Sequence, residues 1–166
     1  KRLGSLADRK ALCDRPANIE WAQAMEEAVV HVVHGLVGRN AHAKLTLVCR
    51  QEGDDVLRYA HIGTGNYNAA TAGTFEDIAL FTADPDVTAD IAELFNYLTG
   101  YRQQSKDRKL LVAPTTLRSG IVKLIQQEAS KPGGRIVIKV NNLVDPEVID
   151  ALYRASEAGV KIDLIV

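Results

Sequence analysis

The pattern of hydrophobic positions along this chain of 166 residues alternates between two periods. Apolar residues recur at helical spacing after Asn18, from Val87 to Leu98, after Thr115 and after Asp145, which predicts four helices. Between these segments lie short apolar runs rich in β-branched residues, which are typical of strands. The expected strands span residues 31–36, 44–50, 56–62, 77–81, 110–113, 135–140 and 160–166. The alternation predicts an α/β sandwich with a largely parallel or mixed sheet.

Residues that commonly begin or end helices bound several of these segments. Asn18, Thr115 and Asp145 each stand where a side chain can accept a hydrogen bond from the N–H groups of a first helical turn. The last helix has the clearest signals, because Pro146 follows its cap and Gly159 follows its end. We therefore expect this helix to be the best defined of the four.

Residues 44–62 are expected to form a β-hairpin. The segment 51–55, Gln-Glu-Gly-Asp-Asp, consists of residues that favour turns and separates two expected strands. Because the chain reverses there, the loop 63–68 should return to the start of the first strand. His42 stands just before that strand, so the loop and His42 are expected to meet in space.

The two segments that meet there carry groups suited to phosphate chemistry. His42 and Lys44 are two positions apart, so on a strand both side chains lie on one face. Imidazole has an ordinary pKa of about 6.5 and is partly neutral and nucleophilic near neutral pH. The run Gly63-Thr64-Gly65-Asn66 offers backbone amides, a hydroxyl and a carboxamide to an anion. A single histidine is more often an ordinary surface residue, and glycines in a loop usually only form a turn. Together, the two segments predict phosphoryl transfer through a phosphohistidine.

Composition limits the other possibilities. Hydrophobic residues make up 46% and charged residues 25%, and the net charge of −1 provides no broad basic field for nucleic acid or an anionic membrane. The longest apolar run, near residues 28–33, is interrupted by His31 and is too short to cross a membrane. Cys13 and Cys49 do not form a metal-spaced set, and two free thiols favour a reducing, cytoplasmic location.

The ends of the chain and one polar segment bear on its organisation. The sequence begins at Lys1 without an initiator Met and stops on an apolar strand pattern at 161–166. We therefore expect it to be an internal piece of a longer protein. Residues 100–109 are mostly polar and charged, and we expect them to form a linker between two parts.

The spacing of the candidate groups is similar to a half-site of the phospholipase D superfamily. That half-site reads H-x-K-x-x-x-x-D followed by G-S/T-x-N, and its first part aligns with His42 and Lys44. Cys49 stands at the aspartate position, so the chain departs from a standard phosphodiesterase half-site. A phospholipase-D-like diesterase would also need a second H-x-K motif downstream.

Longer strings resemble the polyphosphate kinases that phosphorylate themselves on histidine. They are residues 58–68 (RYAHIGTGNYN), 94–100 (LFNYLTG), 139–145 (KVNNLVD), 151–156 (ALYRAS) and 158–166 (AGVKIDLIV). The resemblance covers the chain from about Asn18 onward and implies a phospholipase-D-like fold in two related halves. Residues 1–105 would then form part of the first catalytic half, and residues 106–166 the beginning of the second.

The resemblance also implies a reaction. The terminal phosphate of ATP passes reversibly to an enzyme histidine and then to inorganic polyphosphate, leaving ADP, with Mg²⁺ screening the phosphates. His42 matches the family's phosphorylated histidine, and His61 is a possible second histidine of the site. The positions expected to bind phosphate or ATP are Lys44, Thr64, Gly65, Asn66 and Phe75. The full-length protein is expected to be a homo-oligomer.

Three positions depart from the family pattern near the expected phosphate site. Leu12 and Gly73 each replace an arginine, Leu12 at the position that the family associates with metal and phosphate, and Phe75 replaces a tyrosine. Two alternatives therefore stay open: a diverged, non-catalytic paralogue that binds polyphosphate or nucleotide, and a phospholipase-D-like diesterase. Because other nucleotide-binding parts of the family lie outside these residues, the isolated chain is expected to be inactive.

Overall fold

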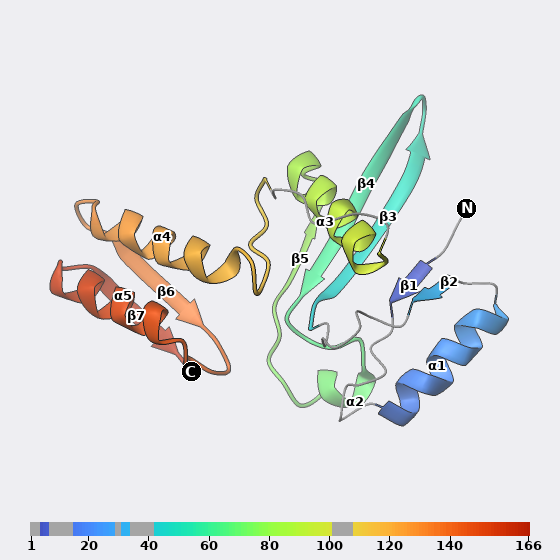
Figure 1. The fold of residues 1–166 in the computed structure, drawn as a ribbon, viewed down its shortest axis with the longest axis horizontal. Helices are drawn as coiled ribbons and strands as arrows, with labels where there is room; N and C mark the ends of the chain where they lie inside the picture. The colour runs from blue at the N-terminus through green and yellow to red at the C-terminus, as the bar shows by residue number, and fades with distance from the viewer. Residues whose placement is uncertain (1–3, 7–14, 29–30, 34–41, 101–107) are drawn as a thin grey trace. The chain divides into compact units, whose positions relative to one another are not determined.

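The computed structural model describes residues 4–6, 15–28, 31–33, 42–100 and 108–166. The chain divides into two compact units, Lys1–Leu110 and Leu111–Val166 (Figure 1). Both units combine helices with strands, and the described strands pair in parallel in two places and antiparallel in another. The expected mixed α/β class is therefore confirmed.

The described start of the first unit contains β1 (Gly4–Leu6), α1 (Arg15–Glu27) and β2 (His31–Val33). β1 and β2 pair in parallel, and α1 lies between them in the sequence. The predicted start of this helix is wrong: it begins at Arg15, so Asn18 lies inside the helix and does not cap it. Pro16 explains the earlier start, since its fixed φ suits the first helical turn. Residues 34–36 of the strand expected over 31–36 lie outside the described part.

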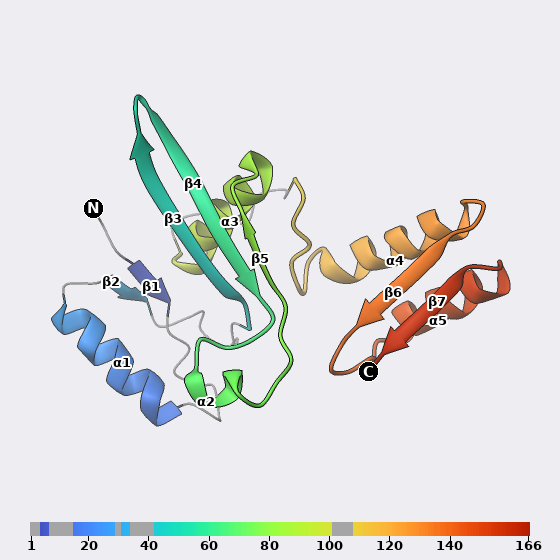
Figure 2. The ribbon, with the colours of Figure 1, turned by 180° about the vertical axis from the view of Figure 1, so that it is seen from behind.

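The main sheet of the first unit is antiparallel, in the order β3 (Lys44–Glu52), β4 (Asp55–Gly63) and β5 (Ala79–Thr82) (Figure 2). The expected hairpin is confirmed, but its strands are longer than predicted and leave only Gly53 and Asp54 in the turn. Gly53 has a φ of 63°, a left-handed conformation that glycine adopts at little steric cost. Lys44 pairs with Gly63, so the start of β3 lies beside the end of β4.

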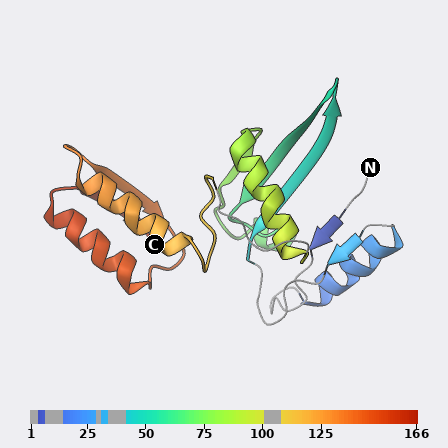
Figure 3. The ribbon, with the colours of Figure 1, turned by 45° about the horizontal axis from the view of Figure 1, so that its top comes forward.

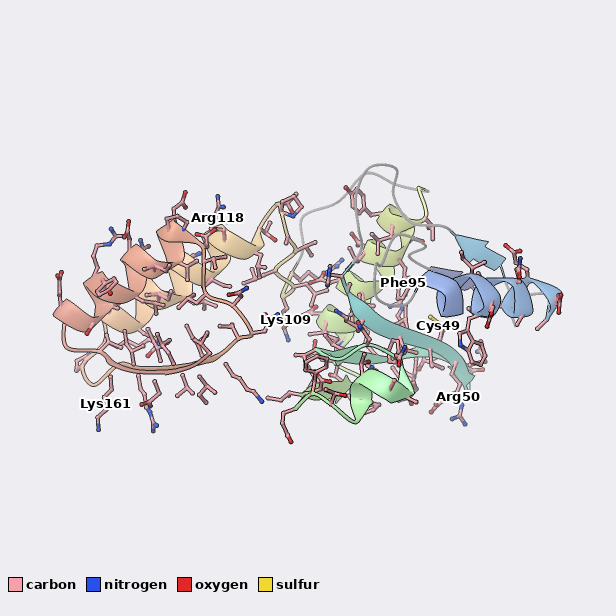
Figure 4. The ribbon with its side chains drawn as sticks, turned by 90° about the horizontal axis from the view of Figure 1, so that it is seen from below. Cys49, Arg50, Phe95, Lys109, Arg118 and Lys161 are labelled. Carbon is pink, nitrogen blue, oxygen red and sulfur yellow. The ribbon has the colours of Figure 1, made fainter. Side chains whose placement is uncertain are left out.

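Helix α3 (Pro85–Leu98) covers one face of this sheet (Figure 3). Ala60 of β4 and Ile91 of α3 are both buried, with 4% and 0% exposure. Figure 4 shows Phe95 on the α3 side of the sheet and Arg50 on the other side. The helix begins two residues before the predicted Val87, because the Asp84 carboxylate accepts hydrogen bonds from the first-turn N–H groups.

The second unit contains α4 (Leu117–Ala129), β6 (Arg135–Lys139), α5 (Pro146–Glu157) and β7 (Lys161–Ile165). β6 and β7 pair in parallel, and both helices pack on the same side of them, opposite Lys161 (Figure 4). The buried core between helices and strands consists of Ile125, Ile136, Val148, Ala151, Leu152, Ala155 and Val160. Its members come from α4, β6, α5 and the residue before β7, so this unit has a hydrophobic core of its own.

The expected ends of α5 are confirmed. The Asp145 side chain accepts a hydrogen bond from the N–H of Val148 at 3.2 Å, and Pro146 lies in the first turn. Gly159 follows the last turn with a φ of 87°. Arg118 of α4 donates to the Asp145 carboxylate at 2.6 Å, and this hydrogen bond is the largest cause that lowers the pKa of Asp145.

Two predictions at the start of the second unit are wrong. Residues 110–113 form no strand, because the N–H of Leu110 is bonded to Asp90 and that of Val112 to the hydroxyl of Thr116. These donors are therefore not available to a neighbouring strand. Thr116 and not Thr115 occupies the N-cap of α4, and the Thr115 hydroxyl donates to the carbonyl of Val112. Among the described helices, none has both the length and the apolar character that crossing a membrane requires.

Candidate phosphate-binding site

The sheet face opposite α3 carries the candidate site. Because side chains alternate along a strand, the pairing of β3, β4 and β5 places Lys44, Thr46, His61 and Phe81 on one face. Leu45, Leu47, Ala60 and Ile62 lie on the other, where α3 packs. A one-residue register shift would exchange these two sets, so the burial of the apolar set fixes the polar set toward solvent.

His42 and Lys44 are brought together as predicted. The Nζ atom of Lys44 lies 3.5 Å from Nδ1 of His42. The imidazole is exposed and the lysine is half-buried, so an anion can reach both from solvent. A phosphoryl group attached to the imidazole would lie within reach of the ammonium group.

The loop that follows β4 starts beside this pair, since Gly63 is the pairing partner of Lys44. The backbone N–H of Thr64 donates to the carbonyl of Ile78 at 3.0 Å. The Thr64 hydroxyl donates to Oδ1 of Asp77 at 2.8 Å and accepts from the N–H of Ile78 at 3.0 Å. The hydroxyl of Thr64 is thus used to hold the loop against the segment that leads into β5.

Gly65 approaches the Asp77 carboxylate so closely that a side chain does not fit between them. The three atoms that a Cβ at Gly65 would meet first all belong to the Asp77 carboxyl group, and two of them would overlap it. By contrast, a Cβ at Gly73 would meet only the carbonyl oxygen of Ala70, at 3.9 Å. A methyl group at position 65 would therefore force the Asp77 side chain, which holds Thr64, to move, whereas one at position 73 would displace nothing.

A chain of hydrogen bonds joins the loop to the sheet at His61. The Tyr67 hydroxyl lies 2.6 Å from Nδ1 of His61 and accepts a hydrogen bond from the Thr46 hydroxyl at 2.9 Å. The centroid of the Phe81 ring lies 4.6 Å from that of the His61 ring, and the two ring planes are inclined by 50°. His61 is therefore held on two sides, on the same face as Lys44.

The other predicted site residues lie farther along the loop. Asn66 is exposed, and its carbonyl accepts a hydrogen bond from the N–H of Asn68 at 2.8 Å. Asn68 caps the short helix α2 (Ala69–Ala72), and Phe75 follows this helix with 65% of its surface exposed. Leu12 lies outside the described residues, as does the segment 39–41 that precedes His42.

Sequence reasoning missed four residues of this site: Thr46, Tyr67, Asp77 and Phe81. The hairpin register pairs Thr46 with His61 across the two strands, so the alternation of side chains could have found it. Tyr67 lies inside the string 58–68, which resembles the polyphosphate kinases, and directly follows the run 63–66. The approach of Asp77 to Gly65 depends on how the chain crosses from α2 to β5, and nothing in the local pattern predicts it.

Two family models divide the chain between them. One, described as polyphosphate kinase C-terminal domain 1, matches residues 1–104, and the other, polyphosphate kinase C-terminal domain 2, matches residues 110–166. The chain belongs to the polyphosphate kinase family. It is 53% identical over 170 residues to the polyphosphate kinase of Mycolicibacterium gilvum and 50% identical over 174 residues to that of Mycobacterium tuberculosis.

These matches cover the whole chain but only part of each polyphosphate kinase. The chain spans 23% of the first of these relatives and 24% of the second. The crystal structure of polyphosphate kinase from Porphyromonas gingivalis matches 99% of the chain with a TM-score of 0.82 and 34% identity, and the match covers 28% of that structure. The expected phospholipase-D-like α/β fold agrees with this match.

Proposed function

We propose that the complete protein transfers the terminal phosphate of ATP to His42 and then to inorganic polyphosphate. The observation that supports this most is the His42–Lys44 pair beside the glycine loop, in a chain of the polyphosphate kinase family. His42 and the glycine loop flank the two paired strands of one hairpin, so the pairing of these strands brings them together. The diesterase and the non-catalytic paralogue have no such support.

The proposed reaction has two displacements at phosphorus. An imidazole nitrogen of His42 attacks the γ-phosphorus of ATP, a P–N bond forms, and the bond to the bridging oxygen breaks so that ADP leaves. A terminal oxygen of polyphosphate then attacks the same phosphorus, a P–O bond forms, and the P–N bond breaks. The covalent intermediate divides one difficult transfer into two easier ones, and the same steps in reverse form ATP.

The neighbouring groups stabilise charge and fix geometry. Lys44 places a positive charge beside the transferred phosphoryl group, whose oxygens carry the negative charge of the transition state. Gly65 and Asn66 present the exposed side of the loop to phosphate, and Thr64 keeps that loop in place through Asp77. Phe75 retains a ring that can stack on the nucleotide base, although it lacks the tyrosine hydroxyl.

His61 is proposed as a second histidine of the site, held in position and not phosphorylated. Its Nδ1 atom faces the Tyr67 hydroxyl, and its ring packs against Phe81. An edge of the same ring would be 3.1 Å from a Cβ placed at Gly63, so it borders the start of the glycine loop. This arrangement fits a group that shapes the phosphate-binding surface beside Lys44.

Mg²⁺ is proposed to enter with the nucleotide. Within residues 42–100 and 108–166 and the shorter described segments, no three His, Cys, Asp or Glu side chains gather as metal ligands. Mg²⁺ often keeps several waters and uses substrate phosphates with only one or two carboxylates, so ATP itself would supply most ligands. When bound, the ion would reduce the charge of the phosphates.

The remaining parts of the protein are proposed to complete the site. Residues 1–105 are proposed to form part of the first catalytic half, and residues 106–166 the beginning of the second. Basic groups beyond these residues would bind the other phosphates, which is why the isolated chain is expected to be inactive. A cytoplasmic location, where ATP is available and thiols such as the exposed Cys49 stay reduced, and a homo-oligomeric state belong to the same proposal.

Incubation of the complete protein with γ-labelled ATP tests the proposed function. We expect a protein-bound label that is stable in base and lost in acid, as a P–N bond requires, and chase with unlabelled polyphosphate should release it into the polymer. A complete, folded protein that binds polyphosphate but never acquires label would contradict the proposal. That outcome would favour the non-catalytic paralogue.

Replacing Gly65 by alanine is expected to slow phosphoryl transfer about 10- to 100-fold, because the added methyl group displaces the loop from the Asp77 carboxylate. The measurement is the rate of label transfer in the complete protein, with circular dichroism to check the fold. The Gly73→Ala variant is the matched control, since its methyl group has room. Equal rates for the two variants would show that the position of the loop does not matter to the reaction.

A further inference from the structure

A buried carboxylate near the end of the first unit has no part in the proposed reaction. Asp90, on α3, is only 1% exposed. Its Oδ2 atom accepts hydrogen bonds from three successive backbone N–H groups, those of Arg108 (2.8 Å), Lys109 (2.7 Å) and Leu110 (3.1 Å). Its Oδ1 atom accepts a hydrogen bond from the Arg108 guanidinium at 3.0 Å. We call Asp90 together with residues 108–110 the clasp.

The clasp is held as a charged group. Burial raises the pKa of Asp90. The hydrogen bonds from the backbone N–H groups of residues 108–110 and from the Arg108 guanidinium lower it by more, so the pKa lies below its ordinary value. Hydrogen bonds to an ionised acceptor are about twice as strong as neutral ones. Within the clasp, the side chain of Lys109 also donates to the Asp84 carboxylate at the start of α3, at 2.8 Å (Lys109 is labelled in Figure 4).

The chain is fixed again immediately after the clasp. Leu111 packs so closely on Gly120 of α4 that a methyl group on this glycine would overlap the leucine side chain. The next residue, Val112, accepts hydrogen bonds at its carbonyl from the N–H groups of Thr116 (2.8 Å) and Leu117 (3.2 Å). The backbone between Leu110 and Leu111 is thus the short segment left between two anchored stretches, one in each unit.

We propose that the clasp is a positioning device, which fixes the point and direction in which the chain leaves the first unit and enters the second. The second family model begins at residue 110, the last residue of the clasp. Hinges between domains are formed by a few residues that absorb changes in φ and ψ, and the bonds around Leu110 and Leu111 lie between the two anchored stretches. Asp90 therefore limits the directions that the main chain can take as it leaves the first unit.

The geometry favours this role over simple stabilisation. Replacing a buried ion pair by apolar groups is often neutral for stability, so burial of Asp90 alone would be no advantage. Three donors from consecutive backbone groups, however, define the path of the main chain, which an apolar contact does not do. The catalytic consequence rests on the proposed function, because it requires that both halves contribute to one site.

The test compares Asp90→Ala with unaltered complete protein by two measurements. Spin labels at Asp54 in the hairpin turn and Gln127 in α4, in a background without native cysteines, report the distribution of distances between the halves. We expect the variant to broaden this distribution and to lower turnover about 100-fold, as misplaced catalytic groups do. Asp86→Asn is the matched control, since Asp86 is an exposed carboxylate on the same helix, 3.8 Å from Lys109.

Two further variants separate positioning from folding. Arg108→Gln removes the guanidinium but leaves the three backbone donors, so its distance distribution should stay narrow. Asp90→Asn keeps one acceptor oxygen, should broaden the distribution less than alanine, and replaces Asp90→Ala if that variant does not fold. A folded Asp90→Ala or Asp90→Asn variant with an unchanged distribution would overturn the proposal, even if turnover falls. The distance measurement does not depend on activity, so it tests the clasp even if the proposed function is wrong.

Discussion

Replacing His42 by glutamine is expected to abolish labelling of the complete protein by γ-labelled ATP. Glutamine keeps the polarity and approximate length of the side chain but cannot form a stable P–N intermediate. Without its nucleophile the covalent route is closed, and we expect polyphosphate synthesis to fall by at least about 10⁴-fold. The site is exposed, so the substitution should not change the fold.

The comparison with other histidines makes this experiment specific. His31→Gln, in β2 of a different sheet, should keep both labelling and synthesis. His61→Gln should still be labelled, though more slowly, because His61 is assigned a supporting position beside the loop. Base-stable label remaining on the His42→Gln variant would mean that another residue carries the phosphate.

Removing the charge of Lys44 is expected to have the second largest effect. In the Lys44→Gln variant the transferred phosphoryl group loses the ammonium that lies 3.5 Å from the His42 ring. Loss of one well-placed charge-stabilising group commonly costs about 10²- to 10³-fold in kcat, and we expect a loss in that range. The effect should appear in kcat more than in KM, because the charge of the phosphoryl oxygens develops in the transition state.

Arg50→Gln is the matched control for Lys44. Arg50 lies on the same strand and alternates onto the same face, but it is six residues farther along and pairs with Glu52 at 3.4 Å. Its removal should change kcat little. Similar losses for both variants would indicate a general effect of positive charge on this face, and not a specific contact of Lys44 with the transferred group.

Local signals were sufficient where neighbouring residues decide the structure. The hairpin followed from alternation and turn residues, and α5 followed from Asp145, Pro146 and Gly159. The same Asp-Pro signal occurs at Asp84 and Pro85, so the true start of α3 was also accessible from the sequence. The apolar periodicity alone begins at Val87 and therefore misses the first two residues of α3.

The remaining errors arise from contacts between residues distant in the sequence. An apolar run at 110–113 is typical of a strand, but Asp90, some 20 residues earlier, takes the N–H of Leu110. The contact between Gly65 and Asp77 likewise depends on the path of the chain through α2. Propensity and periodicity describe how a segment behaves alone, and such contacts override them.

The hairpin also has a consequence for the order of assembly during synthesis. Its pairing joins Lys44 to Gly63, so the proposed nucleophile His42 and the glycine loop are brought together by contacts close in sequence. Hairpins form in about 1–10 μs, whereas ribosomes add roughly 5–20 residues per second. The surface around His42 can therefore be organised on the nascent chain seconds before the second unit is available.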